Sequence, residues 1–247
     1  TKNNHGAVQH RPIHLMPAVL LSQLRTQIDQ LIWTYTRPDD FIKKLHDLLE
    51  YYSNRGVYRP GKNAQPIRQI NTYYTSPLIL KEIEKELVFK IAENPTAALT
   101  LAGALWQENY LELRMISAFI MGQLPVDQAD LTVQRLRQWA NNPQPLFALA
   151  DLLDRATLRL RREKPGVYLE LLQEWIESSQ LTINKTGLEA LTSLVNDKEF
   201  VDLPRVFTII TPLVKRVPSG LQGELRVLLS ALIKRSARET SYFLNQI

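Results

Sequence analysis

The 247-residue chain contains no cysteine, so disulfide bonds, thiolate nucleophiles and cysteine-ligated metals are excluded. It has only 9 glycines, where an average chain of this length has roughly 17. Tight strand turns and phosphate-binding loops depend on that residue. The motifs of P-loop hydrolases, dinucleotide-binding enzymes, zinc proteases and serine hydrolases are missing as well. Two options survive these absences: catalysis by carboxylates, or binding without catalysis. We expect no cofactor.

Histidine is scarce, and three of the four histidines, His5, His10 and His14, lie in a polar N-terminal stretch. A metal site in this stretch is one interpretation. The interpretation we adopt is a loosely ordered lead-in over residues 1–15 without bound metal. Residue 1 is not methionine, which suggests that the numbering begins within a longer product.

Long apolar runs are also missing. No segment approaches the roughly 18 consecutive apolar residues that a membrane-spanning helix needs. The run at 206–214 is short and is interrupted by Thr208, Thr211 and Pro212. The N-terminus lacks the apolar stretch of a signal peptide. We therefore expect a cytoplasmic protein that does not bind membranes.

The chain does contain about twelve short segments with apolar residues at three- and four-residue spacing, the period of an α-helix that buries one face. Proline precedes many of them, in a position where its missing N–H costs nothing. The predicted helices span 16–35, 39–53, 76–93, 96–106, 109–123, 126–140, 144–162, 166–178, 181–195, 199–215, 219–234 and 238–246. Such a series predicts an all-α solenoid of about six antiparallel helix pairs, with 16–247 as a single domain.

Positive charge is concentrated in three windows of the chain. The net charge is +5, but residues 53–75 carry +4, residues 155–164 carry +4 and residues 205–238 carry +6, so the rest of the chain carries −9. A surface that binds a polyanion has this kind of charge distribution. The alternative is that the charges only solvate exposed helix faces.

The segment at 54–75 is the one long connection without a helical period. It interleaves four basic residues with Tyr58, Tyr73 and Tyr74. Long connections in compact domains are usually functional or disordered. Contact with a nucleic-acid backbone is one interpretation, and packing of the tyrosines beneath a connecting loop is the other.

Three motifs in the chain resemble segments of a known family. Residues 105–114 read LWQENYLELR, residues 56–60 and 66–68 read GVYRP and PIR, and residues 175–185 read WIESSQLTINK. In this order, and over roughly residues 39–246, they resemble the DNA alkylation repair family, the AlkD-like helical-repeat glycosylases. The resemblance implies a HEAT-like solenoid whose concave, basic groove holds DNA.

Members of that family cleave the glycosidic bond of cationic alkylated purines, with an aromatic residue, a carboxylate and an arginine near the lesion. The resemblance assigns these roles to Phe147, Asp151 and Lys185. Phe147 and Asp151 are four residues apart and share a helical face. A fixed carboxylate would stabilise the positive charge that develops on the sugar, and the cationic base needs no general acid to leave.

Two of these positions differ from the family pattern. Phe147 replaces a tryptophan and has a weaker attraction for cations, and Lys185 replaces an arginine and lacks its planar fork. A structural role is the alternative for each residue: Phe147 in the core, Asp151 paired with Arg155, and Lys185 solvated. Asp154 is a rival acid on the same segment.

In the first motif we expect Trp106 to pack between helices and Glu112 to anchor an adjacent pair. The remaining candidates are basic residues for contact with DNA: Arg55, Arg59, Lys62, Arg68, Arg159, Arg162, Lys215 and Arg216.

Three functions stay open. The protein is a monomeric glycosylase acting on double-stranded, possibly alkylated DNA, an inactive binder of damaged or branched DNA, or a scaffold for other proteins with basic side chains on both faces.

Overall fold

The computed structural model describes residues 21–53, 70–141 and 146–246, with the backbone alone for 146–150. This part of the chain is all-helical, and its one β-bridge joins Asn71 to Tyr110. The helices are α1 (Leu21–Ile32), α2 (Pro38–Tyr51), α3 (Pro77–Glu93), α4 (Pro95–Gln107), α5 (Leu111–Gln123), η1 (Val126–Gln128), α6 (Ala129–Ala140), α7 (Leu146–Ala156), α8 (Leu158–Glu163), α9 (Pro165–Ile176), α10 (Leu181–Asn196), α11 (Leu203–Lys215), α12 (Gln222–Arg235) and α13 (Ala237–Leu244).

Helix starts are set by local chemistry. Proline occupies the first or second position of α2, α3, α4, α9 and α11. The side chains of Ser76, Asn94 and Asp202 accept hydrogen bonds from the first amides of α3, α4 and α11. These caps satisfy amides that have no partner inside the helix. The prediction that Pro77, Pro165 and Pro204 mark helix starts is confirmed.

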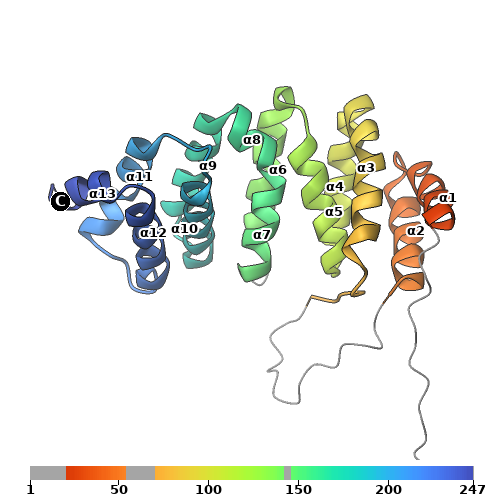
Figure 1. Ribbon diagram of the computed structural model, residues 1–247, viewed down its shortest axis with the longest axis horizontal. Helices are drawn as coiled ribbons and strands as arrows, with labels where there is room; N and C mark the ends of the chain where they lie inside the picture. Colours follow the sequence, from red (N-terminus) through yellow and green to blue (C-terminus); the bar gives the residue numbers. More distant parts are fainter. Residues whose placement is uncertain (1–20, 54–69, 142–145, 247) are drawn as a thin grey trace, which may run out of the picture.

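One predicted helix is wrong in detail. The segment predicted at 144–162 divides at Thr157 into α7 and α8. The buried hydroxyl of Thr157 donates to the carbonyl of Leu153 at 2.7 Å, and the backbone at Thr157 leaves the helical region with φ −102° and ψ 4°. A buried threonine that bonds back to the preceding turn bends a helix, and α8 turns away from the axis of α7 (Figure 1).

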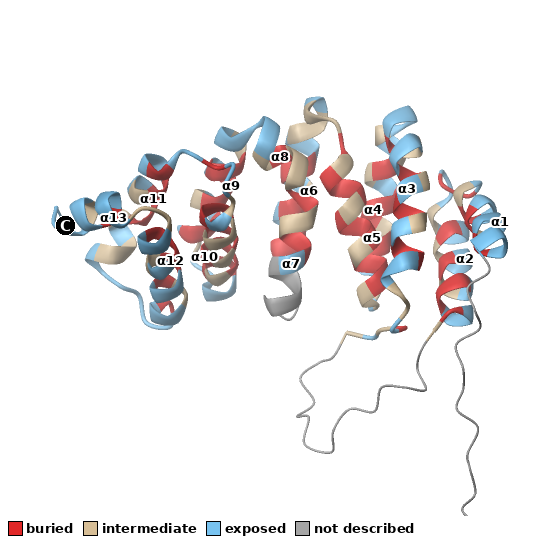
Figure 2. Cartoon of the chain, in the orientation of Figure 1, coloured by how far each residue is buried: buried red, intermediate tan, exposed pale blue. Residues whose placement is uncertain are grey.

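The helices form two rows that pack against each other (Figure 1). In one row α1, α3, α5, α7, α10 and α12 contact one another in this order. In the other, α2 contacts α4, Trp106 of α4 stacks on Trp139 of α6 at 3.7 Å between ring centroids, and Arg137 of α6 pairs with Glu174 of α9 at 2.6 Å. Burial is greatest in central helices such as α4 and α5 and least in α1 and α13 at the ends (Figure 2). Trp106 packs between helices, as predicted.

Two turns between paired helices are held in the same way. We call each such turn an elbow. At the α4–α5 elbow the buried Arg114 donates from Nε to the carbonyl of Trp106 at 3.2 Å. At the α9–α10 elbow Asn184 donates from Nδ2 to the carbonyls of Trp175 and Ile176 at 3.2 and 2.9 Å. In both, a side chain of the second helix donates to carbonyls in the last turn of the first, where the helix itself supplies too few donors.

Helices α5 and α7 approach each other very closely. A Cβ placed on Gly122 of α5 would lie 2.1 Å from the carbonyl oxygen of Arg155 in α7. Only glycine permits backbone contact of this kind. The approach fixes the position of α7, the helix that contains Asp151, against the middle of the array.

Candidate functional site

Asp151 lies on the exposed side of α7. Its carboxylate makes no hydrogen bond or ion pair with any residue that the structure describes. Phe147 belongs to the first turn of the same helix, and its side chain lies outside the described residues. The acid assigned by the resemblance is therefore accessible and has no described partner.

Arg155, four residues after Asp151, is engaged elsewhere. Its Nη2 lies 2.5 Å from Oε1 of Glu84 on α3, and its guanidinium carbon lies 5.5 Å from the ring centroid of Phe119 on α5. Burial raises the pKa of Glu84 above its ordinary value, and the Arg155 cation opposes that rise. The alternative that Asp151 pairs with Arg155 is therefore not realised in the structure.

Lys185 lies on α10, the helix that contacts α7 in the same row. Its Nζ forms an ion pair of 2.8 Å with Oε1 of Glu224 on α12. Burial acts to raise the pKa of Glu224, but the hydrogen bond and charge of Lys185 lower it overall. Glu189, one turn further along α10, has a raised pKa because of burial and the nearby charge of Glu224. Lys185 is therefore paired rather than freely solvated.

The contact between α7 and α10 shows how Asp151 and Lys185 are placed relative to each other along the helix axes. Asp154 of α7 and Ser193 of α10 are hydrogen-bonded, so these positions are level. Asp151 lies about 4.5 Å along the axis from Asp154, and Lys185 about 12 Å from Ser193, at 1.5 Å per residue. Both lie toward the N-terminal ends of two helices that run side by side. Measured along the helix axes, the backbone positions of Asp151 and Lys185 are therefore offset by about 7.5 Å.

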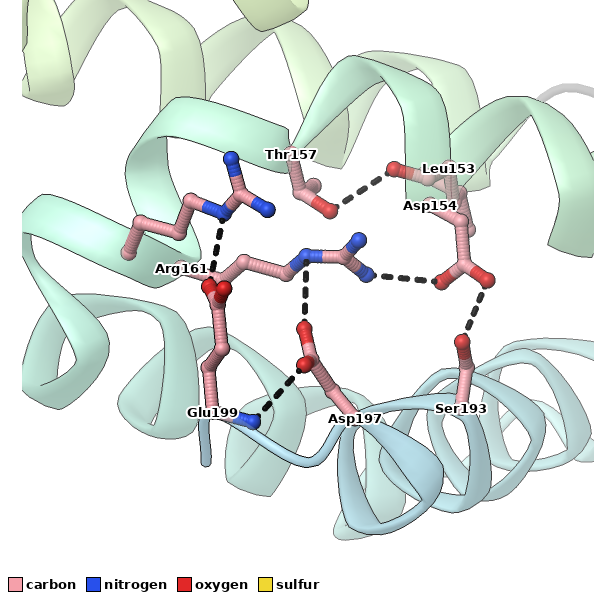
Figure 3. A network of polar contacts seen from close by, with 8 residues as sticks. Leu153, Asp154, Thr157, Arg161, Ser193, Asp197 and Glu199 are labelled. Carbon is pink, nitrogen blue, oxygen red and sulfur yellow. Dashed lines mark hydrogen bonds and ion pairs between the residues drawn. The ribbon is translucent and has the colours of Figure 1, made fainter. Parts of the chain in front are cut away.

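Asp154, the rival acid, has a structural role (Figure 3). It accepts a hydrogen bond from the Ser193 hydroxyl and lies 3.4 Å from Nη1 of Arg161, whose Nε lies 3.9 Å from Asp197. Burial raises the pKa of Asp154 despite the hydrogen bond from Ser193 and the charge of Arg161. This network ties α8 to α7, to α10 and to the turn after α10, and it occupies the carboxylate.

The basic window at 155–164 is largely neutralised in three dimensions. Arg159 pairs with Glu163 at 2.6 Å, and Arg162 pairs with Glu199 at 3.2 Å. Because Glu199 is distant in sequence, a local count of charge could not include it. Neither arginine lies on the helix that contains Asp151: both belong to α8.

Of the other predicted DNA contacts, the structure describes Lys215 and Arg216. Lys215 and Arg216 lie at the C-terminal end of α11, exposed and without an ion pair to the described residues. The candidates between residues 54 and 69 lie outside the described residues: Arg55, Arg59, Lys62 and Arg68. The lead-in at 1–15 with its three histidines lies outside them as well. The convergence of these side chains on one surface stays a prediction.

The fully buried Tyr168 beside this network gives a pH-dependent prediction. Burial raises the pKa of Tyr168 from 10.0 to about 12, and the charge of Asp154 adds to the rise. Because the folded value is the higher one, the stabilisation is fully present below pH 10 and is lost as the pH rises to about 12. Two pH units correspond to about 3 kcal/mol.

We therefore expect the free energy of unfolding to fall by about 2 kcal/mol more in the wild type than in Tyr168→Phe between pH 9 and pH 12, because at pH 12 the folded Tyr168 is itself half ionised. Urea unfolding followed by circular dichroism at a series of pH values measures this difference. Equal pH dependence in the two proteins would mean that Tyr168 ionises as readily in the fold as in the unfolded chain.

Two further properties concern the part of the chain that the structure describes. Among the described side chains, no group of three or more histidine, aspartate or glutamate residues is placed to hold a metal ion. None of the described helices combines the length and hydropathy that crossing a bilayer requires.

The part of the chain that the structure describes is all-helical, and at the centre of one row it has an accessible carboxylate, that of Asp151, without a partner among the described residues. Residues 77–217, more than half of the chain, match the family described as DNA alkylation repair enzyme. The chain belongs to this family, which confirms the resemblance seen in the three motifs and supports a role in alkylation repair. No curated protein and no solved structure matches the chain.

Proposed function

We propose that this protein is a DNA-binding, HEAT-like α-solenoid of about six helix pairs that hydrolyses the N-glycosidic bond of cationic alkylated purines. Double-stranded DNA is the partner, bound by a monomer through backbone and shape contacts with little reading of base sequence. A cytoplasmic location stays part of this proposal. Family membership supports the DNA-related role, and the site on α7 supports the chemistry.

The observation that carries the proposal is the unpaired carboxylate of Asp151 beside an engaged arginine. An exposed aspartate normally gains from an i,i+4 cation, yet the nearest such cation, Arg155, is bound to Glu84. The carboxylate is free to face an external positive charge. A departing alkylpurine leaves such a charge on the sugar, and a fixed anion near it lowers the barrier.

The binding surface in this proposal is formed by side chains without described acidic partners. Lys215 and Arg216 meet this condition. Arg55, Arg59, Lys62 and Arg68 are further candidates, which rest on the sequence alone. Arg159 and Arg162 would have to exchange their carboxylates for phosphates. Such contacts release counterions, so binding should weaken steeply with salt.

The test compares the wild type with Asp151→Asn on duplex DNA that carries methylated purines. We expect release of free modified base by the wild type and a loss of about 100-fold or more in the variant, the size found when one electrostatic stabiliser of a transition state is removed. Binding measured by fluorescence anisotropy should stay within about twofold. Base release at an unchanged rate in Asp151→Asn would contradict the assignment.

A second function is favoured by one specific contact. Lys185, at the position of the family's arginine, is paired with Glu224 and so is not free to hold a phosphate. This supports an inactive binder of damaged or branched DNA. In that case neither protein releases base, and both bind the duplex with the same steep dependence on salt. If no binding occurs at low salt, both DNA functions are wrong and a protein-interaction scaffold is left.

A further inference from the structure

The contacts of Arg155 determine the state of Asp151. The two residues are four apart in α7 and share one face of the helix. This is the spacing at which an aspartate and an arginine pair on a helix surface. In the structure the pair is not formed, although no backbone change would be needed to form it.

Glu84 competes for the same guanidinium group. It is 8% exposed, and its carboxylate lies 2.5 Å from Nη2 of Arg155. An ion pair with one partner this buried is screened less by water than an exposed pair on a helix surface. Without Arg155 the buried charge of Glu84 would be uncompensated. The competition between the two carboxylates therefore favours Glu84 over Asp151.

The fold directs Arg155 toward Glu84. Gly122 lets the backbone of α7 at Arg155 lie directly against α5. Phe119, one turn before Gly122, lies beneath the guanidinium, with 5.5 Å between the guanidinium carbon and the ring centroid. The side chain thus crosses α5 over an aromatic ring, a favourable contact for a cation, and reaches α3.

The remaining acid beside Arg155 is also accounted for. Asp154 precedes Arg155 directly, but its carboxylate is bound by Ser193 and Arg161. Two acids of α7 thus lie next to one arginine that pairs with neither. One of them is held in a network, and the other, Asp151, stays exposed.

We propose that Glu84 is a positioning residue, which holds Arg155 across α5 and thereby keeps the carboxylate of Asp151 available for a cationic ligand. The ligand class rests on the proposed function: the positively charged alkylated base, or the sugar that carries positive charge as the base departs. Loss of the charge on Glu84 releases Arg155, which then turns to Asp151 and neutralises it.

The test follows the side-chain carboxyl carbon of Asp151 by ¹³C NMR during a pH titration. In Glu84→Gln the titration midpoint of Asp151 should fall by roughly half to one pH unit, because a neighbouring cation favours the charged form. In the double variant Glu84→Gln with Arg155→Gln the midpoint should return to the wild-type value. An unchanged midpoint in Glu84→Gln, or a fall that persists in the double variant, overturns the proposal.

If Glu84→Gln does not fold, the double variant still decides the question. It should fold because it buries no unpaired charge, and its two glutamine amides can form a hydrogen bond with each other. If Arg155 already paired with Asp151 in the wild type, the midpoint in the double variant would lie above the wild-type value, and the proposal would be wrong. An equal midpoint supports it. Circular dichroism of each variant verifies the fold.

A measurement of base release distinguishes failure of this proposal from failure of the proposed function on which it rests. If the wild type releases base from methylated duplex, Glu84→Gln should do so about tenfold more slowly, and the double variant should recover most of the rate. If the wild type releases none, the proposed function fails, while the NMR midpoints still decide whether Glu84 keeps Arg155 away from Asp151.

Discussion

Replacement of Gly122 by alanine is expected to destabilise the protein by about 3–4 kcal/mol, near the upper end for an overpacked core. The new methyl group would lie 2.1 Å from the carbonyl oxygen of Arg155. That atom belongs to the backbone of α7 and cannot rotate away as a side chain can. Helix α7 would have to move from α5, which would also disturb the contact of Arg155 with Phe119.

Gly166→Ala in α9 is the matched control. A Cβ at that position meets nothing within 4 Å, so alanine should be neutral or stabilise by up to about 1 kcal/mol through its better helix propensity. Urea unfolding followed by circular dichroism measures both variants. If the two have the same unfolding midpoint, α5 and α7 are not in backbone contact.

Replacement of Glu112 by alanine should cost about 4 kcal/mol, because one buried oxygen serves three donors. Its Oε1 accepts hydrogen bonds from the Thr72 hydroxyl at 2.6 Å and from the amides of Tyr73 and Tyr74, both at 2.9 Å. These bonds hold Tyr74 at φ 55°, a conformation that a residue other than glycine rarely adopts. The variant removes an acceptor from the buried amide of Tyr73 and releases the turn before α3.

Glu112→Gln separates charge from geometry. The amide keeps an oxygen at the same place but no negative charge, so about half of the loss is expected, roughly 2 kcal/mol. Hydrogen exchange at the amides of Tyr73 and Tyr74 should speed up more in the alanine variant than in the glutamine variant. A loss below about 1 kcal/mol in Glu112→Ala would show that the carboxylate does not hold this turn.

Local features of the sequence were sufficient to predict the helices. The apolar period and the prolines at helix starts act within one or two turns, so their effect can be seen without the fold. The structural roles expected for Trp106 and Glu112 are confirmed, since one stacks between helices and the other anchors a neighbouring segment. The break at Thr157 was missed, because a threonine that bonds back to the preceding turn has no distinct sequence pattern.

The electrostatics of the site could not be predicted in the same way. The resemblance pointed to Asp151, but its availability depends on Glu84, which is 71 residues away from Arg155 in the sequence. The basic window at 155–164 misled for the same reason. Its charge was counted along the chain, whereas two of the acids that pair with it, Asp197 and Glu199, come from beyond the next two helices.

The two elbows explain why this array shows no clear sequence repeat. An arginine closes one and an asparagine closes the other, and the two side chains reach equivalent carbonyls from equivalent places in the following helix. The two elbows thus share the position of a donor rather than the identity of a residue. Two helix pairs of this chain can therefore close their turns in the same way without sharing a sequence motif.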